Sequence, residues 1–177
     1  YDGVQTKVYK PSEFHRQNAN PIGNQTHFIA GDKDGNVFFD SDQSLIRYDI
    51  QTQKFSCLRK SNVYTVASIK GTIWVGIADS ILTWNPDKND FDFVTRLENR
   101  NQRATCLLED SGGRYWIGTT DGLFKMNDDK SLTCMIMGED IYDLYEDSKY
   151  NLWISIRMNG MYKRDVHGNF TRYRYDP

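Results

Sequence analysis

The sequence lacks any long hydrophobic run. No apolar segment approaches the roughly 20 residues that a membrane-spanning helix requires. No secretory leader is visible either. The chain does not begin with Met, so we expect it to be a fragment of a longer array, and the missing leader excludes no compartment. We expect this fragment to make no contact with a membrane.

Cysteine and histidine are scarce. The three cysteines, Cys57, Cys106 and Cys134, are odd in number and have no Cys-x-x-Cys spacing, which argues against a disulfide framework and a zinc motif. They stand among strand-forming residues, so we expect three buried free thiols. The three histidines are scattered through the sequence without a shared spacing. We therefore predict that the chain binds no metal and no cofactor.

Neither sign of charge is in excess. The 22 Lys and Arg residues are balanced by 24 Asp and Glu, which gives a formal net charge of −2. Domains that bind nucleic acid usually carry a clustered basic excess, so we expect no nucleic-acid partner for this fragment.

Signatures of catalysis are also missing. The sequence contains neither Gly-x-Ser-x-Gly nor His-Glu-x-x-His. A lyase or glycosidase on this chain stays an open alternative, but a glycosidase needs two carboxylates about 5–10 Å apart in one cleft. The paired carboxylates at residues 109–110 and 146–147 recur with a repeat, which favours a structural role. We predict that the fragment is not an enzyme.

The sequence does contain a repeat. The stretch EDSGGRYWIGTTDGLFKMN begins at Glu109, and related stretches begin at Gly31, Ser68 and Glu146. The aromatic residues that follow the first turn of each copy lie 36, 42 and 37 residues apart, and they are Phe38, Trp74, Trp116 and Trp153. A period near 40 residues indicates stacked units, none of which buries its apolar face alone.

Each copy divides into four short strand-like segments separated by Gly, Asp and Asn. No segment has sustained helical periodicity. We predict an all-β fold, a partial β-propeller of about four four-stranded antiparallel blades. The expected divisions are the end of a preceding blade with a linker in residues 1–25, and blades in residues 26–60, 61–102, 103–139 and 140–177.

The repeated residues have structural explanations. Gly112 and Gly113 should supply the positive φ of a tight hairpin, and Asp110 should cap it through backbone amides. Trp116 should fill the space between blades, and Gly118 should let the next blade approach closely. The residues assigned to the structural repeat are Trp74, Asp110, Gly113, Trp116, Gly118, Gly122, Asp147, Trp153 and Gly160.

A ligand site is expected where the copies differ, in the loops between second and third strands and in the loops between blades. The fourth copy has one extra residue before its Gly160. Arginine in these loops could bind the carboxylate of an acidic sugar. Solvated loop residues are the alternative. The candidate ligand-binding residues are Arg103, Thr120, Asp121, Arg157, Met158 and Asn159.

The repeat resembles the two-component regulator propeller family. LLEDSGGRYWIGTTDGLFKMN, from Leu107, matches its pattern almost throughout, and LYEDSKYNLWISIRMNGMYKR, from Leu144, matches well. The first copy has Phe38 in place of Trp, and the second has lost the acidic pair. The family's repeat has no invariant ligand residue, so the resemblance assigns no site.

Propellers of this family form the extracytoplasmic sensors of hybrid two-component histidine kinases, many of which detect oligosaccharides. The resemblance therefore implies a fragment of a periplasmic sensor that responds to an oligosaccharide. The alternative is a propeller that binds a partner protein and no small molecule. The expected partners are the oligosaccharide in the intact sensor, the remaining propeller blades and a second copy of the chain, as a homo-oligomer.

Overall fold

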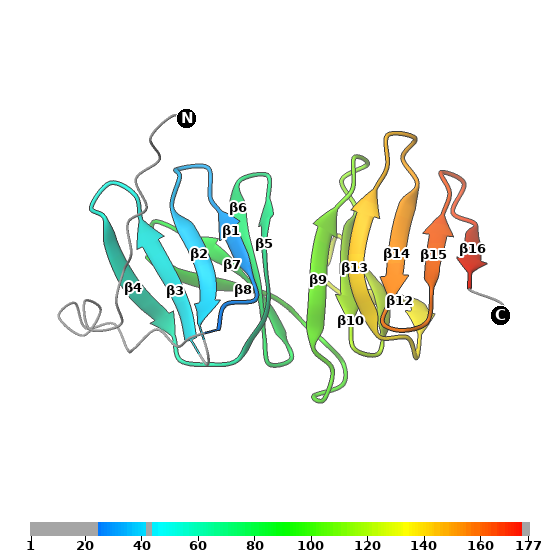
Figure 1. The fold of residues 1–177 in the computed structure, drawn as a ribbon, viewed down its shortest axis with the longest axis horizontal. Coiled ribbons are helices and arrows are strands. Elements are labelled where there is room, and N and C mark those ends of the chain that lie inside the picture. The colour runs from blue at the N-terminus through cyan, green and yellow to red at the C-terminus, as the bar shows by residue number, and fades with distance from the viewer. Residues whose placement is uncertain (1–24, 42–43, 175–177) are drawn as a thin grey trace, which may run out of the picture.

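The computed structural model describes residues 25–41 and 44–174. They form sixteen strands in four antiparallel sheets, and each sheet is a meander of four strands in sequence order (Figure 1). The strands of blade 1 are β1 (Ile29–Gly31), β2 (Val37–Ser41), β3 (Ser44–Asp49) and β4 (Lys54–Arg59). Those of blade 2 are β5 (Val63–Ile69), β6 (Thr72–Ile77), β7 (Ser80–Asn85) and β8 (Asp90–Arg96).

Blade 3 contains β9 (Ala104–Glu109), β10 (Tyr115–Thr119), β11 (Gly122–Met126) and β12 (Leu132–Met137). Blade 4 contains β13 (Ile141–Glu146), β14 (Leu152–Ile156), β15 (Met161–Arg164) and β16 (Phe170–Tyr173). The first strands of successive blades, β1, β5, β9 and β13, contact one another in turn. The predicted all-β partial propeller of four four-stranded blades is therefore confirmed.

The hydrophobic core lies between the blades. One cluster joins Phe38 and Leu45 of blade 1 to Trp84 and Phe91 of blade 2, and two further clusters join blades 2 and 3 and blades 3 and 4. Alternating burial along a strand such as β14 places one set of side chains against blade 3 and the other set on the opposite face of the sheet. Residues 1–24, where a preceding blade was expected, lie outside the described residues. None of the described residues belongs to a helix that could cross a membrane.

The repeated aspartate has two roles. Asp110 Oδ1 accepts hydrogen bonds from the backbone N–H groups of Gly112 and Arg114, both at 3.0 Å. Its Oδ2 accepts one from the indole Nε1 of Trp116 at 2.8 Å. Asp147 accepts a bond of the same length from Trp153. The sequence predicted the turn cap, but the indole bond, which explains the six-residue spacing, was missed.

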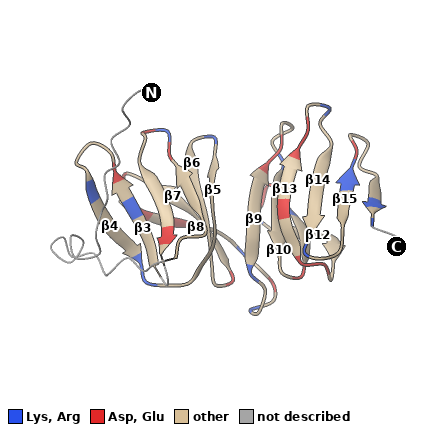
Figure 2. Ribbon diagram, viewed as in Figure 1, with Lys and Arg blue, Asp and Glu red and all other residues tan. Residues whose placement is uncertain are grey.

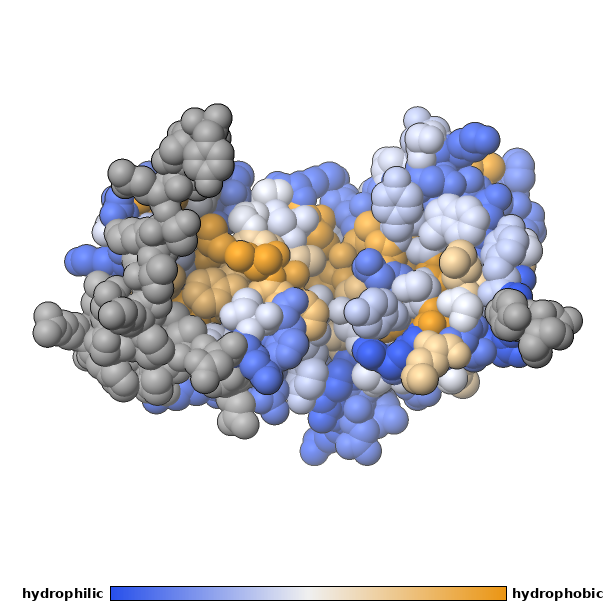
Figure 3. Space-filling model, viewed as in Figure 1, coloured by the Kyte–Doolittle hydropathy of each residue, from blue (hydrophilic) through white to orange (hydrophobic). Residues whose placement is uncertain are grey.

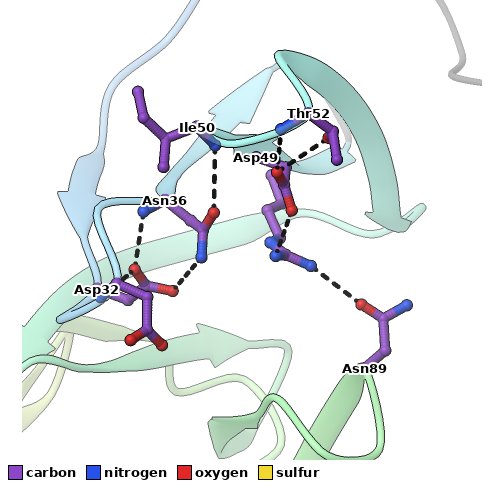
Figure 4. Close-up of polar contacts among 8 residues, drawn as sticks. Asp32, Asn36, Asp49, Ile50, Thr52 and Asn89 are labelled. Atoms are coloured by element: carbon purple, nitrogen blue, oxygen red, sulfur yellow. Dashed lines mark hydrogen bonds and ion pairs between the residues drawn. The ribbon is translucent and has the colours of Figure 1, made fainter.

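A similar turn recurs in blade 1 (Figure 4). Asp32 accepts from the backbone and the side chain of Asn36, both at 2.8 Å, and Asn36 Oδ1 accepts from the backbone N–H of Ile50 at 3.2 Å. The first hairpin of the blade is thereby tied to the second, between β3 and β4.

The positive φ of these hairpins falls on one residue, three positions after the aspartate. Gly113 has φ 77°, and Tyr150 adopts φ 63° at the same place after Asp147. Gly112 is not among the positive-φ residues, so its expected left-handed conformation was wrong. The turn between β10 and β11 is made by Thr120 and Asp121, because Gly122 already pairs with Thr119 in the ladder.

The small residue of β10 allows close contact between blades. A Cβ on Gly118 would lie 2.7 Å from Cγ2 of Ile141 in blade 4 and 2.3 Å from Sγ of Cys106. Trp116 is buried beside it, as predicted. Trp74 is half-buried and stacks on Tyr115 of the next blade, with ring centroids 5.1 Å apart.

Trp153 occupies the equivalent place on the far face of blade 4, and it is half-buried rather than largely buried. No described blade covers that face.

The expectation of three buried thiols was wrong in part. Cys106 is buried, and burial raises the pKa of its thiol to about 12. Cys57 is half-buried and Cys134 is exposed. Cys134 lies on β12, the outermost strand of its blade, which has no neighbouring strand on its outer side among the described residues.

Candidate ligand-binding groove

A groove of about 880 Å³ crosses the first strands of blades 2, 3 and 4. The hydrophobic surface in the middle of Figure 3 lies where Figure 1 places β5 and β9. Apolar side chains of these strands line the groove, among them Val66 and Leu107, and polar groups stand around them. The polar or charged lining residues are His27, Tyr64, Thr65, Arg103, Thr105, Thr120, Tyr142, Asp143 and Arg157.

Equivalent positions on three first strands face this groove. Tyr64, Thr105 and Tyr142 are the second residues of β5, β9 and β13, and all three line it. Thr105 Oγ1 donates to the backbone carbonyl of Ile141 at 2.6 Å, which ties β9 to β13. The groove floor is thus held by the contacts that join the blades.

Arg103 stands in the loop between blades 2 and 3. Its guanidinium carbon lies 5.1 Å from the centre of the Tyr64 ring, and its Nη1 donates to the backbone carbonyls of Arg100 and Gln102 at 2.7 and 2.9 Å. Its backbone is paired with Thr120, whose N–H donates to the Arg103 carbonyl at 3.0 Å. The loop and the β10–β11 turn therefore form one edge of the groove.

Arg157 stands in the loop between β14 and β15. Its guanidinium carbon lies 4.9 Å from the centre of the Tyr142 ring, and its Nε donates to Oδ2 of Asp140 at 2.9 Å. Its backbone N–H donates to the Asp140 carbonyl at 2.8 Å. The backbone hydrogen bond of Arg157 in blade 4 is thus equivalent to that of Thr120 in blade 3, since each N–H donates to a carbonyl in the loop before the first strand of its blade.

The structure brings together three of the six predicted ligand-binding residues, Arg103, Thr120 and Arg157. The other three do not line the groove. Met158 is fully exposed at φ 57°, Asn159 donates to Oε2 of Glu139 at 2.9 Å, and Asp121 is exposed in its turn.

Four lining residues were not predicted from the sequence, because strand positions were assigned to packing: Tyr64, Thr105, Tyr142 and Asp143. A usable signal was present, since a tyrosine recurs at the second position of the first strand in copies two and four.

Charged side chains of both signs lie at the groove, where Asp140 pairs with Arg157. Asp143 is the only carboxylate among its described lining residues, against Arg103 and Arg157. Elsewhere, acidic and basic residues are interspersed in the loops at both ends of the strands (Figure 2). Within the part of the chain that the structure describes, no three His, Cys, Asp or Glu side chains are grouped to hold a metal ion.

Comparison with known proteins gives one family and a set of similar folds. The family described as two component regulator propeller matches residues 100–121, which run from the loop of Arg103 through β9 and β10 to the β10–β11 turn. No curated protein sequence matches the chain.

The extracellular domain of BT4673 from B. thetaiotaomicron, named as a hybrid two component system, has a TM-score of 0.75 at 19% identity. The match covers 89% of this chain and 23% of that one. The extracellular domain of BT3049 from the same organism, also named as a hybrid two component system, has a TM-score of 0.74 at 20% identity, over 97% and 24% of the two chains.

Virginiamycin B lyase from Staphylococcus aureus is also similar, with a TM-score of 0.68 at 16% identity over 86% and 57% of the chains. At these identities the structures establish the fold, and this chain spans about a quarter of the two extracellular domains. The resemblance read from the sequence is confirmed by the family match at residues 100–121. The similar structures show the propeller fold over most of the chain.

Proposed function

We propose that this chain is part of the periplasmic ligand-sensing propeller of a hybrid two-component sensor, and that the ligand is an oligosaccharide. The match to the two component regulator propeller family supports the sensor part of this proposal. The matched residues include the first strand of blade 3, which lies in the middle of the groove. The similar structures include extracellular domains named as hybrid two component systems.

The groove is the observation that carries the ligand proposal. It is long enough to cross three first strands, and it combines an apolar floor with tyrosine, threonine and arginine side chains at its edges. Ligand sites generally have this composition, with a few polar groups around apolar surface. An oligosaccharide has many hydroxyl groups together with the apolar faces of its rings, and it suits such a surface.

A second candidate function is a platform for a partner protein. The far face of blade 4 favours it, because Tyr145 is 64% exposed there and Met161 is 42% exposed. With Trp153 they line a hollow of about 280 Å³. We propose no catalytic role, although virginiamycin B lyase has a similar fold, because only Asp143 among the described groove residues offers a carboxylate.

A glycan array followed by calorimetry tests the proposal, beside a pull-down from periplasmic extract. We expect saturable binding of an oligosaccharide class by the folded chain. Retention of one protein in stoichiometric amount, with no bound glycan on the array, would instead favour the platform.

A further inference from the structure

The groove contains two arginines that are held in the same way. Arg103 lies over the ring of Tyr64 on β5, and Arg157 lies over the ring of Tyr142 on β13, with 5.1 and 4.9 Å from guanidinium carbon to ring centre. The two tyrosines stand on either side of β9, which contacts both β5 and β13. A guanidinium stacked on an aromatic ring keeps its in-plane N–H groups free to bind a planar anion.

Each guanidinium retains donors for a ligand. Nη1 of Arg103 bonds to two neutral carbonyls, which leave its charge uncompensated, and Nε and Nη2 have no partner among the described residues. Nε of Arg157 is paired with Asp140, while its Nη1 and Nη2 have no described partner. The side chain of Arg157 is half exposed.

The surroundings do not neutralise both cations. Asp143 is the only carboxylate among the described residues that line the groove, and its Oδ1 already accepts from the backbone N–H of Leu144 at 2.8 Å. His27, which also lines the groove, is bonded through Nδ1 to Asp40 at 2.9 Å. An anionic group entering the groove therefore meets Arg103, which has no carboxylate partner among the described residues, and Arg157, whose Nη groups are unpaired there although its Nε is bonded to Asp140.

We propose that Arg103 and Arg157 make the groove selective for an anionic oligosaccharide, one that bears a carboxylate or a sulfate group. This inference rests on the proposed function, since it assumes that the ligand is a saccharide. A carboxylate or sulfate accepts two parallel N–H bonds from one guanidinium, a geometry that a neutral hydroxyl group cannot match. The Tyr64 and Tyr142 rings hold the two guanidinium planes in place for such contacts.

Isothermal titration calorimetry of the full chain tests this with three probes: trigalacturonate for the carboxylate, a sulfated chondroitin disaccharide for the sulfate, and neutral galactotriose. We expect at least one acidic probe to bind at least about tenfold more tightly than galactotriose, with an affinity that falls as salt increases. Arg103→Ala and Arg157→Ala should each weaken it by about tenfold or more. The Arg→Lys variants should recover only part of that loss, because lysine lacks the planar fork.

Arg96→Ala is the matched control. Arg96 also lies over an aromatic ring, that of Phe93 at 6.0 Å, but it does not line the groove. Its loss should leave the affinity unchanged, and thermal denaturation should show that all variants are folded. Which acidic probe binds distinguishes a uronic acid from a sulfated sugar.

Equal affinity for galactotriose and both acidic probes, unchanged in the two Arg→Ala variants, would overturn the anionic selectivity and leave oligosaccharide sensing standing. Binding of none of the three probes to the folded chain would also overturn this inference. The glycan array would then decide the proposed function separately.

Discussion

The carboxylate of Asp110 joins a hairpin turn to the core, because its Oδ2 lies 2.8 Å from the indole Nε1 of Trp116. The Asp110 side chain is only 2% exposed, and Trp116 is buried between blades 3 and 4. If the Asp110 carboxylate only capped its turn, its removal would lower the free energy of unfolding little. Here the same group satisfies a buried indole donor.

Asp110→Ala should therefore destabilise the chain by about 2–4 kcal/mol, since it removes the turn cap and leaves a buried N–H without a partner. Urea denaturation measures the loss. Asp34→Ala, in the exposed turn of blade 1, is the control and should change the stability by less than about 0.5 kcal/mol. Equal effects of the two substitutions would show that neither the turn cap nor the indole bond contributes to stability.

The lowered pKa values of Asp147 and Asp110 predict that the folded chain loses stability in acid. Hydrogen bonds from Trp153 and Asn151 lower the pKa of Asp147 from its usual 3.8. Burial raises the pKa of Asp110, but the hydrogen bonds from Trp116 and Arg114 outweigh it and the net pKa is lowered. Because the folded-state pKa lies below the unfolded value, their contribution is present above about pH 4 and is lost as the pH falls through the folded-state values. Melting temperatures between pH 7 and pH 2 should fall below pH 4, and less steeply in Asp147→Asn.

Gly118→Ala should destabilise the interface between blades 3 and 4 by about 1–3 kcal/mol, because the new methyl group meets Ile141 and Cys106. Gly31→Ala on β1 is the matched control. Its added Cβ would have its nearest described neighbour at 3.8 Å, the backbone oxygen of Asn36. Thermal unfolding of both variants checks the difference, and a Gly118→Ala protein as stable as Gly31→Ala would contradict the close approach of the blades.

The far face of blade 4 predicts self-association. In blade 3 the equivalent face is covered by Ile141 and its neighbours, whereas Tyr145 and Met161 remain exposed on blade 4. Sedimentation velocity of the isolated chain should show dimers or larger species, and Tyr145→Glu should shift them towards monomer. Tyr150→Glu, in the exposed hairpin turn of the same blade, should have no such effect. A monomer at all concentrations would rule out this surface as a contact between copies.

Thiol alkylation followed by mass spectrometry should show that the cysteines differ in reactivity in the folded chain. Cys134 is exposed on β12 and should be modified in the folded chain, while Cys106 should react only on unfolding, because its thiol is buried and its raised pKa disfavours the thiolate. Rapid modification of Cys106 under native conditions would mean that blades 3 and 4 separate readily.

The repeat predicted the blades because its period is local: Phe38, Trp74, Trp116 and Trp153 each follow a turn within one copy. Arg103 and Arg157 were chosen as candidates because the sequence places them in loops, and their role in binding a ligand stays a prediction. Tyr64 and Tyr142 were missed, since their meeting in one groove depends on how first strands of different blades pack together. Alternation along a strand tells which residues share a face, but it does not tell which distant strands that face will meet.

The central claim, that the ligand lies across the first strands of blades 2 to 4, is tested most directly by methyl NMR of the chain during titration with trigalacturonate. The account predicts shifts of the methyl groups of Thr105, Thr120 and Val66, which line the groove. The NMR signals of the Met158 methyl group, exposed in its loop, and of the Met161 methyl group, on the far face of blade 4, should not shift. Shifts at Met161 with none at Thr105 and Thr120 would place the ligand on the far face of blade 4 and contradict the groove as its site.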